Sequence, residues 1–259
     1  DHCRFYEERV AAGLREKTVL ELGTGWYPIV PIALFLKNAD RIISIDIQNW
    51  MTKESQLTAI RRIIHHRKNG HLDRLLPNIN EERWQVLESI VTNVESLTKE
   101  TINEKLRLET LIQDARNTEF ADSSIDFICS NNTFEHVYTE VLRAILVEFK
   151  RIIKPDGIMS HFVDLSDHFA HFDSTINIYN FLQFSESTWN LIDNRIQPQN
   201  RLRWKDYLNM YADLQIPATA ANVRPGSVEQ LRSVQLAAQY RGYSERELAI
   251  SHGYLVSKM

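Results

Sequence analysis

A strand-like segment that ends in two glycines constrains this chain more than any other feature. Residues 18–22 read Thr-Val-Leu-Glu-Leu, a short apolar run typical of a buried strand. Gly23 and Gly25 follow, and they permit a tight turn close to a ligand because neither carries a Cβ atom. Pro28 suits the first turn of a helix, and residues 29–37 are apolar almost all round, as in a buried helix. A strand, a glycine turn and a helix in this order form the nucleotide-binding corner of a doubly wound α/β sheet.

A carboxylate further along indicates what kind of nucleotide this corner holds. Residues 41–46 predict a second strand, and Asp46 stands at its carboxyl end, about 20 residues past the glycines. At that spacing an acid accepts hydrogen bonds from ribose hydroxyls, as it does for a dinucleotide or for S-adenosylmethionine. A dinucleotide site calls for glycine where Pro28 stands, and Glu21 would oppose a pyrophosphate but attract an ammonium or sulfonium group. These two residues favour S-adenosylmethionine.

Further motifs follow these in the chain. The full set is Glu21-Leu22-Gly23-Thr24-Gly25, Asp46, Asp114-Ala115, residues 120–128, Phe134-Glu135-His136-Val137 and Lys154-Pro155-Asp156-Gly157. In this order they resemble the class I S-adenosylmethionine-dependent methyltransferases over residues 18–163. One position departs from the family pattern, because Tyr27 replaces a third glycine. We therefore expect Trp26 and Tyr27 to crowd the methionine end of the cofactor.

The resemblance implies a fold, a cofactor and a cofactor site. The implied fold is one methyltransferase domain over residues 1–259, with a doubly wound, mostly parallel, seven-stranded Rossmann-like sheet and a last strand that pairs antiparallel at its edge. The implied cofactor is S-adenosyl-L-methionine, whose adenine amino group would donate to the Asp114 carboxylate, a pure acceptor. Asn131 follows the fourth strand, at the edge where open α/β sheets bind ligands. The predicted cofactor-binding residues are Glu21, Gly23, Thr24, Gly25, Asp46, Asp114, Ala115 and Asn131.

Two stretches exceed what a plain doubly wound sheet needs. After Asp46 the third strand is delayed to about residues 108–112, because two or three helical patterns intervene. We predict helical insertions at about residues 50–106 and 165–200, which form a cap over the active site. The first insertion has a basic run at residues 61–74, for which a solvated helix face is favoured over a clamp on an anionic substrate.

Histidines and carboxylates gather at the end of the predicted fifth strand and in the loop after it. They are His161, Asp164, His168, His171 and Asp173. The spacing suits three or four metal ligands, a general base with an orienting carboxylate, or histidines that only cap or pack. Because the chain has no H-E-x-x-H or C-x-x-C pattern, we predict no metal and favour the base, since imidazole titrates near neutrality. The predicted catalytic residues are His168 as the base, with Asp164, His136 and His161.

Composition narrows the functional class without identifying the acceptor. The net charge of −4 does not indicate nucleic-acid binding. The two cysteines do not suggest a disulfide framework, and no apolar run is long enough to span a bilayer. We expect a cytoplasmic, biosynthetic methyltransferase that acts on a small molecule, a sugar or a lipid-linked acceptor. A nicotinamide-dependent oxidoreductase and a non-catalytic cofactor-binding member of the same fold are the alternatives. There is no signal-peptide pattern, and the start at Asp1 rather than Met is compatible with native residues before it.

Overall fold

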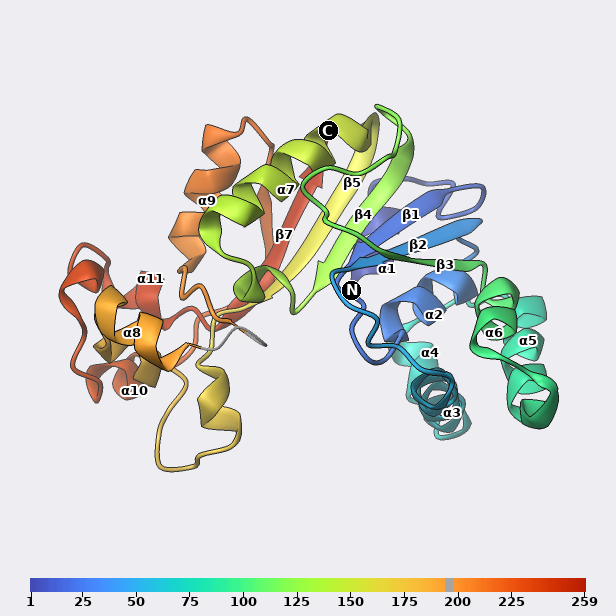
Figure 1. Ribbon diagram of the computed structural model, residues 1–259, viewed down its shortest axis with the longest axis horizontal. Coiled ribbons are helices and arrows are strands. Elements are labelled where there is room, and N and C mark those ends of the chain that lie inside the picture. Colours follow the sequence, from blue (N-terminus) through green and yellow to red (C-terminus); the bar gives the residue numbers. More distant parts are fainter. Residues whose placement is uncertain (194–197) are drawn as a thin grey trace. The chain divides into compact units, whose positions relative to one another are not determined.

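A seven-stranded sheet flanked by helices forms the framework of the computed structural model, which describes residues 1–193 and 198–259 (Figure 1). The strands are β1 (Thr18–Leu22), β2 (Arg41–Asp46), β3 (Leu108–Ile112), β4 (Ile125–Asn131), β5 (Ile153–Asp164), β6 (Thr219–Arg224) and β7 (His252–Lys258). Their order across the sheet is β3-β2-β1-β4-β5-β7-β6. β1 pairs parallel with β2 and with β4, β2 pairs parallel with β3, and β6 pairs antiparallel with β7. The predicted fold class is confirmed. The last strand was expected at the edge of the sheet, but β7 lies between β5 and β6, and β6 is the edge strand.

Helices fill the intervals between the strands. They are α1 (His2–Glu7), α2 (Ile29–Leu36), α3 (Lys53–Lys68), α4 (Leu72–Leu75), α5 (Glu81–Thr92), α6 (Lys99–Lys105), α7 (Thr139–Ile152), α8 (Glu186–Ile192), α9 (Trp204–Asp213), α10 (Val228–Arg232) and α11 (Glu245–Ala249). Short 3-10 turns are η1 (Val94–Ser96), η2 (Phe134–His136), η3 (His168–His171), η4 (Asn180–Gln183) and η5 (Ala238–Tyr240). Among these described helices, none combines the length and the apolarity that a bilayer crossing requires.

The chain divides into two compact units, each with its own interior. The first unit comprises Asp1–Asn131, Glu148–Ser160 and Lys258–Met259, and the second comprises Asn132–Val147 and His161–Ser257. Helix α7 and strand β5 therefore each contribute residues to both units. The predicted insertion at residues 50–106 falls in the first unit and the one at residues 165–200 in the second, although residues 194–197 lie outside the described part.

The interior of the first unit is formed by mainly apolar residues of β1, β2 and β4. Val19, Leu20 and Ile43 are fully buried, as expected of parallel strands covered on both faces. Asp126 interrupts the run of β4 and is also buried. Its carboxylate accepts hydrogen bonds from the Thr18 N–H at 3.0 Å and from Lys154 Nζ at 2.8 Å. The acid therefore ties β4 to the beginnings of β1 and β5.

Helices α3, α4, α5 and α6 occupy the long interval between β2 and β3 in the first unit (Figure 1). Helix α3 packs against α5, where the Arg67 guanidinium lies 4.3 Å from the Trp84 ring centroid and 2.6 Å from the Glu81 carboxylate. Arg61 and Arg62 on α3 are exposed. The insertion thus has its own packing, and α3 presents a basic side to solvent.

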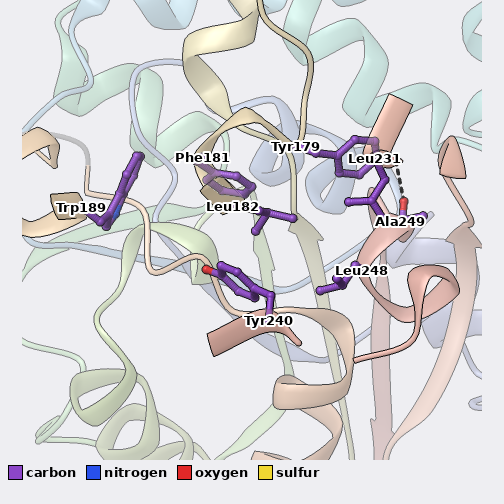
Figure 2. Packing of buried hydrophobic residues seen from close by; sticks show 8 residues of the cluster. All are labelled: Tyr179, Phe181, Leu182, Trp189, Leu231, Tyr240, Leu248 and Ala249. Atoms are coloured by element: carbon purple, nitrogen blue, oxygen red, sulfur yellow. Dashed lines mark hydrogen bonds between the residues drawn. The ribbon is translucent and has the colours of Figure 1, made fainter. Parts of the chain in front are cut away.

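The second unit has a separate aromatic core, which Figure 2 shows. Its members are Tyr179, Phe181, Leu182, Trp189, Leu231, Tyr240, Leu248 and Ala249. The Tyr179 hydroxyl donates to the Ala249 carbonyl at 2.7 Å (Figure 2). It also accepts from the Ser227 N–H at 2.9 Å. The aromatic-rich segment that follows β5 therefore serves mainly to pack this unit.

A buried arginine secures the loops of the second unit. Arg203 is fully buried, and its guanidinium donates to the carbonyls of Leu165, Leu248 and Ile250, each at 2.7 Å. Since Leu165 directly follows the last residue of β5, this side chain fixes the point where the chain leaves the sheet. The two terminal nitrogens of this buried guanidinium find these partners, whereas its Nε–H has none among the described residues.

Candidate functional site

The glycine loop after β1 is shaped by backbone conformation. Gly23 and Gly25 have φ angles of +75° and +64°, the left-handed region that glycine adopts without steric cost. The Gly23 N–H donates to the Ile45 carbonyl at 2.8 Å, and the Gly25 N–H donates to Asp46 Oδ2 at 3.1 Å. A Cβ atom on Gly25 would meet no other atom within 4 Å. The loop therefore has open space beside it, where a ligand can approach the backbone.

Glu21 supplies a buried carboxyl group beneath this loop. The residue is 3% exposed, and the Thr24 hydroxyl donates to its Oε2. Because that hydroxyl gives its one proton to Glu21, it accepts in turn from Ser44 Oγ at 2.5 Å. Burial raises the pKa of Glu21 to about 8, the nearby Asp46 charge adds to the rise, and the Thr24 bond opposes it. The group is poised to ionise when a cation arrives.

Asp46, at the end of β2, and Asp114, in the loop after β3, supply two further carboxylates. Besides the Gly25 bond, Asp46 accepts from the Gln48 N–H at 3.2 Å through Oδ1, and its remaining lone pairs suit hydroxyl donors. Asp114 accepts from Arg116 Nε at 2.9 Å and from the Arg116 N–H at 2.9 Å. These bonds hold the pKa of Asp114 below its usual value, so the carboxylate stays ionised. Ala115 beside it is buried.

The aromatic residues of the loop lie at its surface. Trp26 is 59% exposed and stacks on Trp50, with ring centroids 5.0 Å apart. Tyr27 is also exposed, and the Arg62 guanidinium lies 5.5 Å from its ring centroid. Both rings are thus engaged by side chains of the following segments, Trp50 before α3 and Arg62 on it.

The residues of the first unit fit S-adenosylmethionine. The buried Glu21 carboxyl suits a positively charged group, Asp46 offers acceptors to ribose hydroxyls, and the space beside Gly25 admits a ligand against the backbone. One hydrogen bond joins Thr24 to Glu21, and another joins Gly25 to Asp46. Asp114 makes its bonds with Arg116 in its own loop, and Asn131 ends β4. The roles of all these residues in cofactor binding stay predictions.

A second group of polar side chains follows β4 and β5, within the second unit. His136 lies on η2, Asp164 ends β5 and His168 begins η3. The rings of His136 and His168 have centroids 4.8 Å apart, and His168 Nε2 lies 3.9 Å from Asp164 Oδ2. The His171 ring lies 5.6 Å from that of His168 and is exposed. The structure thus brings together three of the four predicted catalytic residues.

His161, the fourth, lies in the interior. It is fully buried in β5, and its ring stacks on Phe134 with centroids 4.3 Å apart. A ring in this position contributes packing, and direct contact with a substrate would require that packing to open. The catalytic role of His161 stays a prediction.

Glu135 is the residue that sequence reasoning left without a role of its own. It is 3% exposed, its Oε1 accepts from the Asp164 N–H at 3.3 Å, and its Oε2 has no hydrogen-bond partner within residues 1–193 and 198–259. Burial raises the pKa of Glu135 well above its usual value, and the Asp164 charge adds to the rise. Its position next to His136 was the available signal. Only the structure shows that its carboxyl group turns inward.

The segment at residues 198–200 fixes the histidines in place. The Pro198 carbonyl accepts from His136 Nδ1 at 2.7 Å, and Gln199 Oε1 accepts from the His168 N–H at 3.2 Å. Asn200 donates through its side chain to two carbonyls at the ends of η2, both at 2.8 Å. Sequence reasoning missed these residues because they lie far along the chain from their partners.

Burial keeps the two histidines neutral. It lowers the pKa of His168 to about 4, with the neighbouring His136 adding to the fall and Asp164 opposing it. It also lowers the pKa of His136, against the Pro198 bond and the Asp164 charge. Neutral imidazoles can take up a proton or ligate a metal ion. Ligand atoms of Glu135, His136 and His168 lie within 4.8 Å of one another, as do those of Asp164, His168 and His171.

Comparisons with known proteins concern the fold of this chain. Residues 84–160 match a family model described as a methyltransferase domain. Geranyl diphosphate C-methyltransferase from Streptomyces coelicolor A3(2), crystallised with Mg²⁺, geranyl diphosphate and S-adenosyl-L-homocysteine, has a TM-score of 0.53 at 11% identity, covering 99% of this chain and 77% of that one. A protein from Galdieria sulphuraria described as a sarcosine dimethylglycine methyltransferase has a TM-score of 0.52 at 15% identity, covering 98% and 83%. At these identities the likeness shows the fold. A search of curated proteins gave no match.

Proposed function

We propose that this chain is a class I S-adenosylmethionine-dependent methyltransferase, which its match to a methyltransferase domain and its fold support. We further propose that it methylates a small-molecule, sugar or lipid-linked acceptor whose proton is taken by His168. The observation that carries the proposal is the position of His168 Nε2, 3.9 Å from Asp164 Oδ2 and beside the His136 ring. A neutral imidazole with a carboxylate next to it is the arrangement of a general base.

The first unit would hold the cofactor. When bound, S-adenosylmethionine supplies a methyl group on a positively charged sulfur, so the protein's task is to position it and to exclude water. Glu21 would face the positive charge of the methionine end, and Asp46 would accept from the ribose hydroxyls. Asp114, ionised by its bonds to Arg116, would accept from the adenine amino group.

The second unit would prepare the acceptor. A hydroxyl or a weakly acidic C–H must lose a proton as it takes up the methyl group. His168 would receive this proton at Nε2, and the Asp164 carboxylate would stabilise the imidazolium that forms. The similar Streptomyces enzyme acts on geranyl diphosphate, a small isoprenoid, which supports a small or lipid-linked acceptor. The free thiols of Cys3 and Cys129 are in keeping with a role in cytoplasmic biosynthesis.

Calorimetric titration tests the cofactor assignment. We expect S-adenosylhomocysteine to bind with micromolar affinity and NAD not to bind. Asp46→Ala should weaken S-adenosylhomocysteine at least about tenfold, because ribose hydroxyls would lose their acceptor. Asp73→Ala, in the exposed first turn of α4, is the control and should leave the affinity unchanged. Binding of NAD alone, or an unaltered Asp46→Ala, would remove this site from the proposal.

A methyl-transfer assay with labelled S-adenosylmethionine tests the role of His168 as the base. The acceptors are a panel of hydroxylated small molecules, sugars and isoprenoid phosphates. His168→Ala should retain S-adenosylhomocysteine binding and lower turnover by about 10²- to 10⁴-fold. His171→Ala, on the same turn but exposed, should have little effect. Turnover that is the same in His168→Ala and in the native protein would contradict the role of His168.

A further inference from the structure

We propose that Glu135, His136 and His168 bind one divalent metal ion, of the kind represented by Zn²⁺ or Co²⁺. Ligand atoms of these three residues lie within 4.8 Å of one another, so small side-chain rotations bring them to one ion. Two imidazoles and a carboxylate are a donor set that such ions favour, and three protein ligands leave positions open for substrate. The catalytic consequence of this site rests on the proposed methyl transfer. With the ion bound, Asp164 would replace His168 as the group that takes the proton.

The orientation of His136 suits a ligand. A carbonyl only accepts hydrogen bonds, so the 2.7 Å bond to Pro198 requires the proton of the neutral ring to be on Nδ1. The lone pair of this ring is then on Nε2. Metal-bound histidines are commonly held in this way, with the second nitrogen donating to a carbonyl or a carboxylate. Gln199 holds the backbone of His168 through its N–H at 3.2 Å.

The burial of Glu135 supports the metal site independently of the histidines. The Asp164 N–H satisfies one carboxylate oxygen, while Oε2 is buried with no hydrogen-bond partner in the part of the chain that the structure describes. A buried polar oxygen without a partner costs free energy, and a buried carboxylate costs more unless a cation accompanies it. A divalent ion between Glu135 and the two imidazoles would supply both the partner and the charge. The alternative set with Asp164 and His171 is more exposed and has no such oxygen.

The ion would change how the acceptor loses its proton. With a metal bound, the lone pair of His168 is committed to the ion, and an acceptor hydroxyl that coordinates the ion becomes more acidic. Its proton would pass to the Asp164 carboxylate, whose Oδ2 lies 3.9 Å from His168 Nε2. The oxygen would keep the electron pair with which it attacks the methyl group. In the metal-free protein His168 itself takes the proton.

Metal titrations of the metal-free full chain test the site. CoCl₂ binding is followed by visible absorption, and ZnCl₂ and MgCl₂ binding by calorimetry. We expect one equivalent of Co²⁺ or Zn²⁺ to bind and Mg²⁺ to bind at least about tenfold more weakly. Glu135→Gln, which keeps the shape of the side chain, and His168→Gln, which alters a partly exposed one, should each weaken Co²⁺ at least about tenfold.

Two matched variants exclude other histidines. His171→Gln should leave Co²⁺ affinity unchanged. If this variant lost Co²⁺ binding, the site would be formed by Asp164, His168 and His171, and the proposed ligand set would be overturned. His66→Gln tests adventitious binding on α3, where the His66 and His71 rings lie 6.0 Å apart. Absence of stoichiometric binding, or binding lost only in His66→Gln, would overturn the inference. S-adenosylhomocysteine titrated in parallel separates the two proposals: if it binds and no metal does, the metal site fails alone.

Discussion

The glycine loop of the first unit and the histidine cluster of the second are built by opposite means. The loop consists of consecutive residues, 21–25, whose backbone turns at two glycines and donates to the next strand. The cluster joins the turn at residues 134–136, the end of β5 and the segment at residues 198–200 through side-chain hydrogen bonds. The geometry of the loop should therefore be sensitive to changes of backbone freedom. The geometry of the cluster should be sensitive to the loss of polar partners from distant segments.

The largest effect should come from the arginine that secures the second unit. Arg203→Met leaves three buried carbonyls without donors, so we expect the free energy of unfolding to fall by about 3–5 kcal/mol. Urea unfolding measures it. Arg246→Met, at an exposed position on α11, is the matched control and should change stability by no more than about 0.5 kcal/mol. Equal changes in the two variants would mean that side-chain bonds do not hold this unit.

Glu21 in the glycine loop should make the protein less stable as the pH rises. The pKa of Glu21 rises from 4.5 to about 8 on folding, so the unfolded chain releases this proton first. Its contribution to stability is complete below pH 4.5 and is lost as the pH rises through 8, by at most about 1.4 kcal/mol per pH unit. Unfolding of native protein and Glu21→Gln at pH 5 and pH 8 measures this. The variant should lose less stability than the native protein, and identical losses would refute the assignment.

His168 in the histidine cluster should have the opposite effect, because it makes the protein less stable as the pH falls. This effect should be smaller than that of Glu21. The pKa of His168 falls from 6.5 to about 4 on folding, so the unfolded chain binds a proton first as the pH is lowered. This contribution is complete above pH 6.5 and is lost as the pH falls through 4, by about 1–2 kcal/mol, since the ring is partly solvated. His168→Gln should be less sensitive to acid than the native protein between pH 6.5 and 4. A variant that is just as sensitive would contradict the lowered pKa.

A pair of glycine substitutions gives a change in stability no larger than that of His168, and it tests the loop directly. Gly25 and Gly70 have φ angles of +64° and +67°, and a Cβ atom on either would meet nothing within 4 Å. Changing each to alanine should cost about 1–2 kcal/mol of conformational strain. Gly25→Ala alone should also weaken S-adenosylhomocysteine, because its Cβ would fill space beside the cofactor loop. Equal cofactor affinities in the two variants would show that the space beside Gly25 is not used.

Sequence patterns predicted local features well and long-range ones poorly. The strand with Glu21, the glycine turn and the acid at position 46 follow from periodicity and spacing, and the fold that they imply is confirmed. His136, Asp164 and His168 were chosen as chemically suitable side chains at strand ends, and the structure brings them together. The inward turn of Glu135 and the bonds from residues 198–200 could not be predicted, because they depend on contacts between segments that no local pattern relates.

The interval between β2 and β3 bears on the order in which the chain assembles. These strands are parallel neighbours, with Ile42 opposite Leu108 and Asp46 opposite Ile112, yet four helices separate them in the chain. Closing so long a loop is slow compared with forming the helices, which make local contacts. On the ribosome, the glycine loop emerges long before the strand that flanks Asp46 has been synthesised. A nascent chain therefore carries its glycine loop for some time before the strand beside Asp46 completes this part of the sheet.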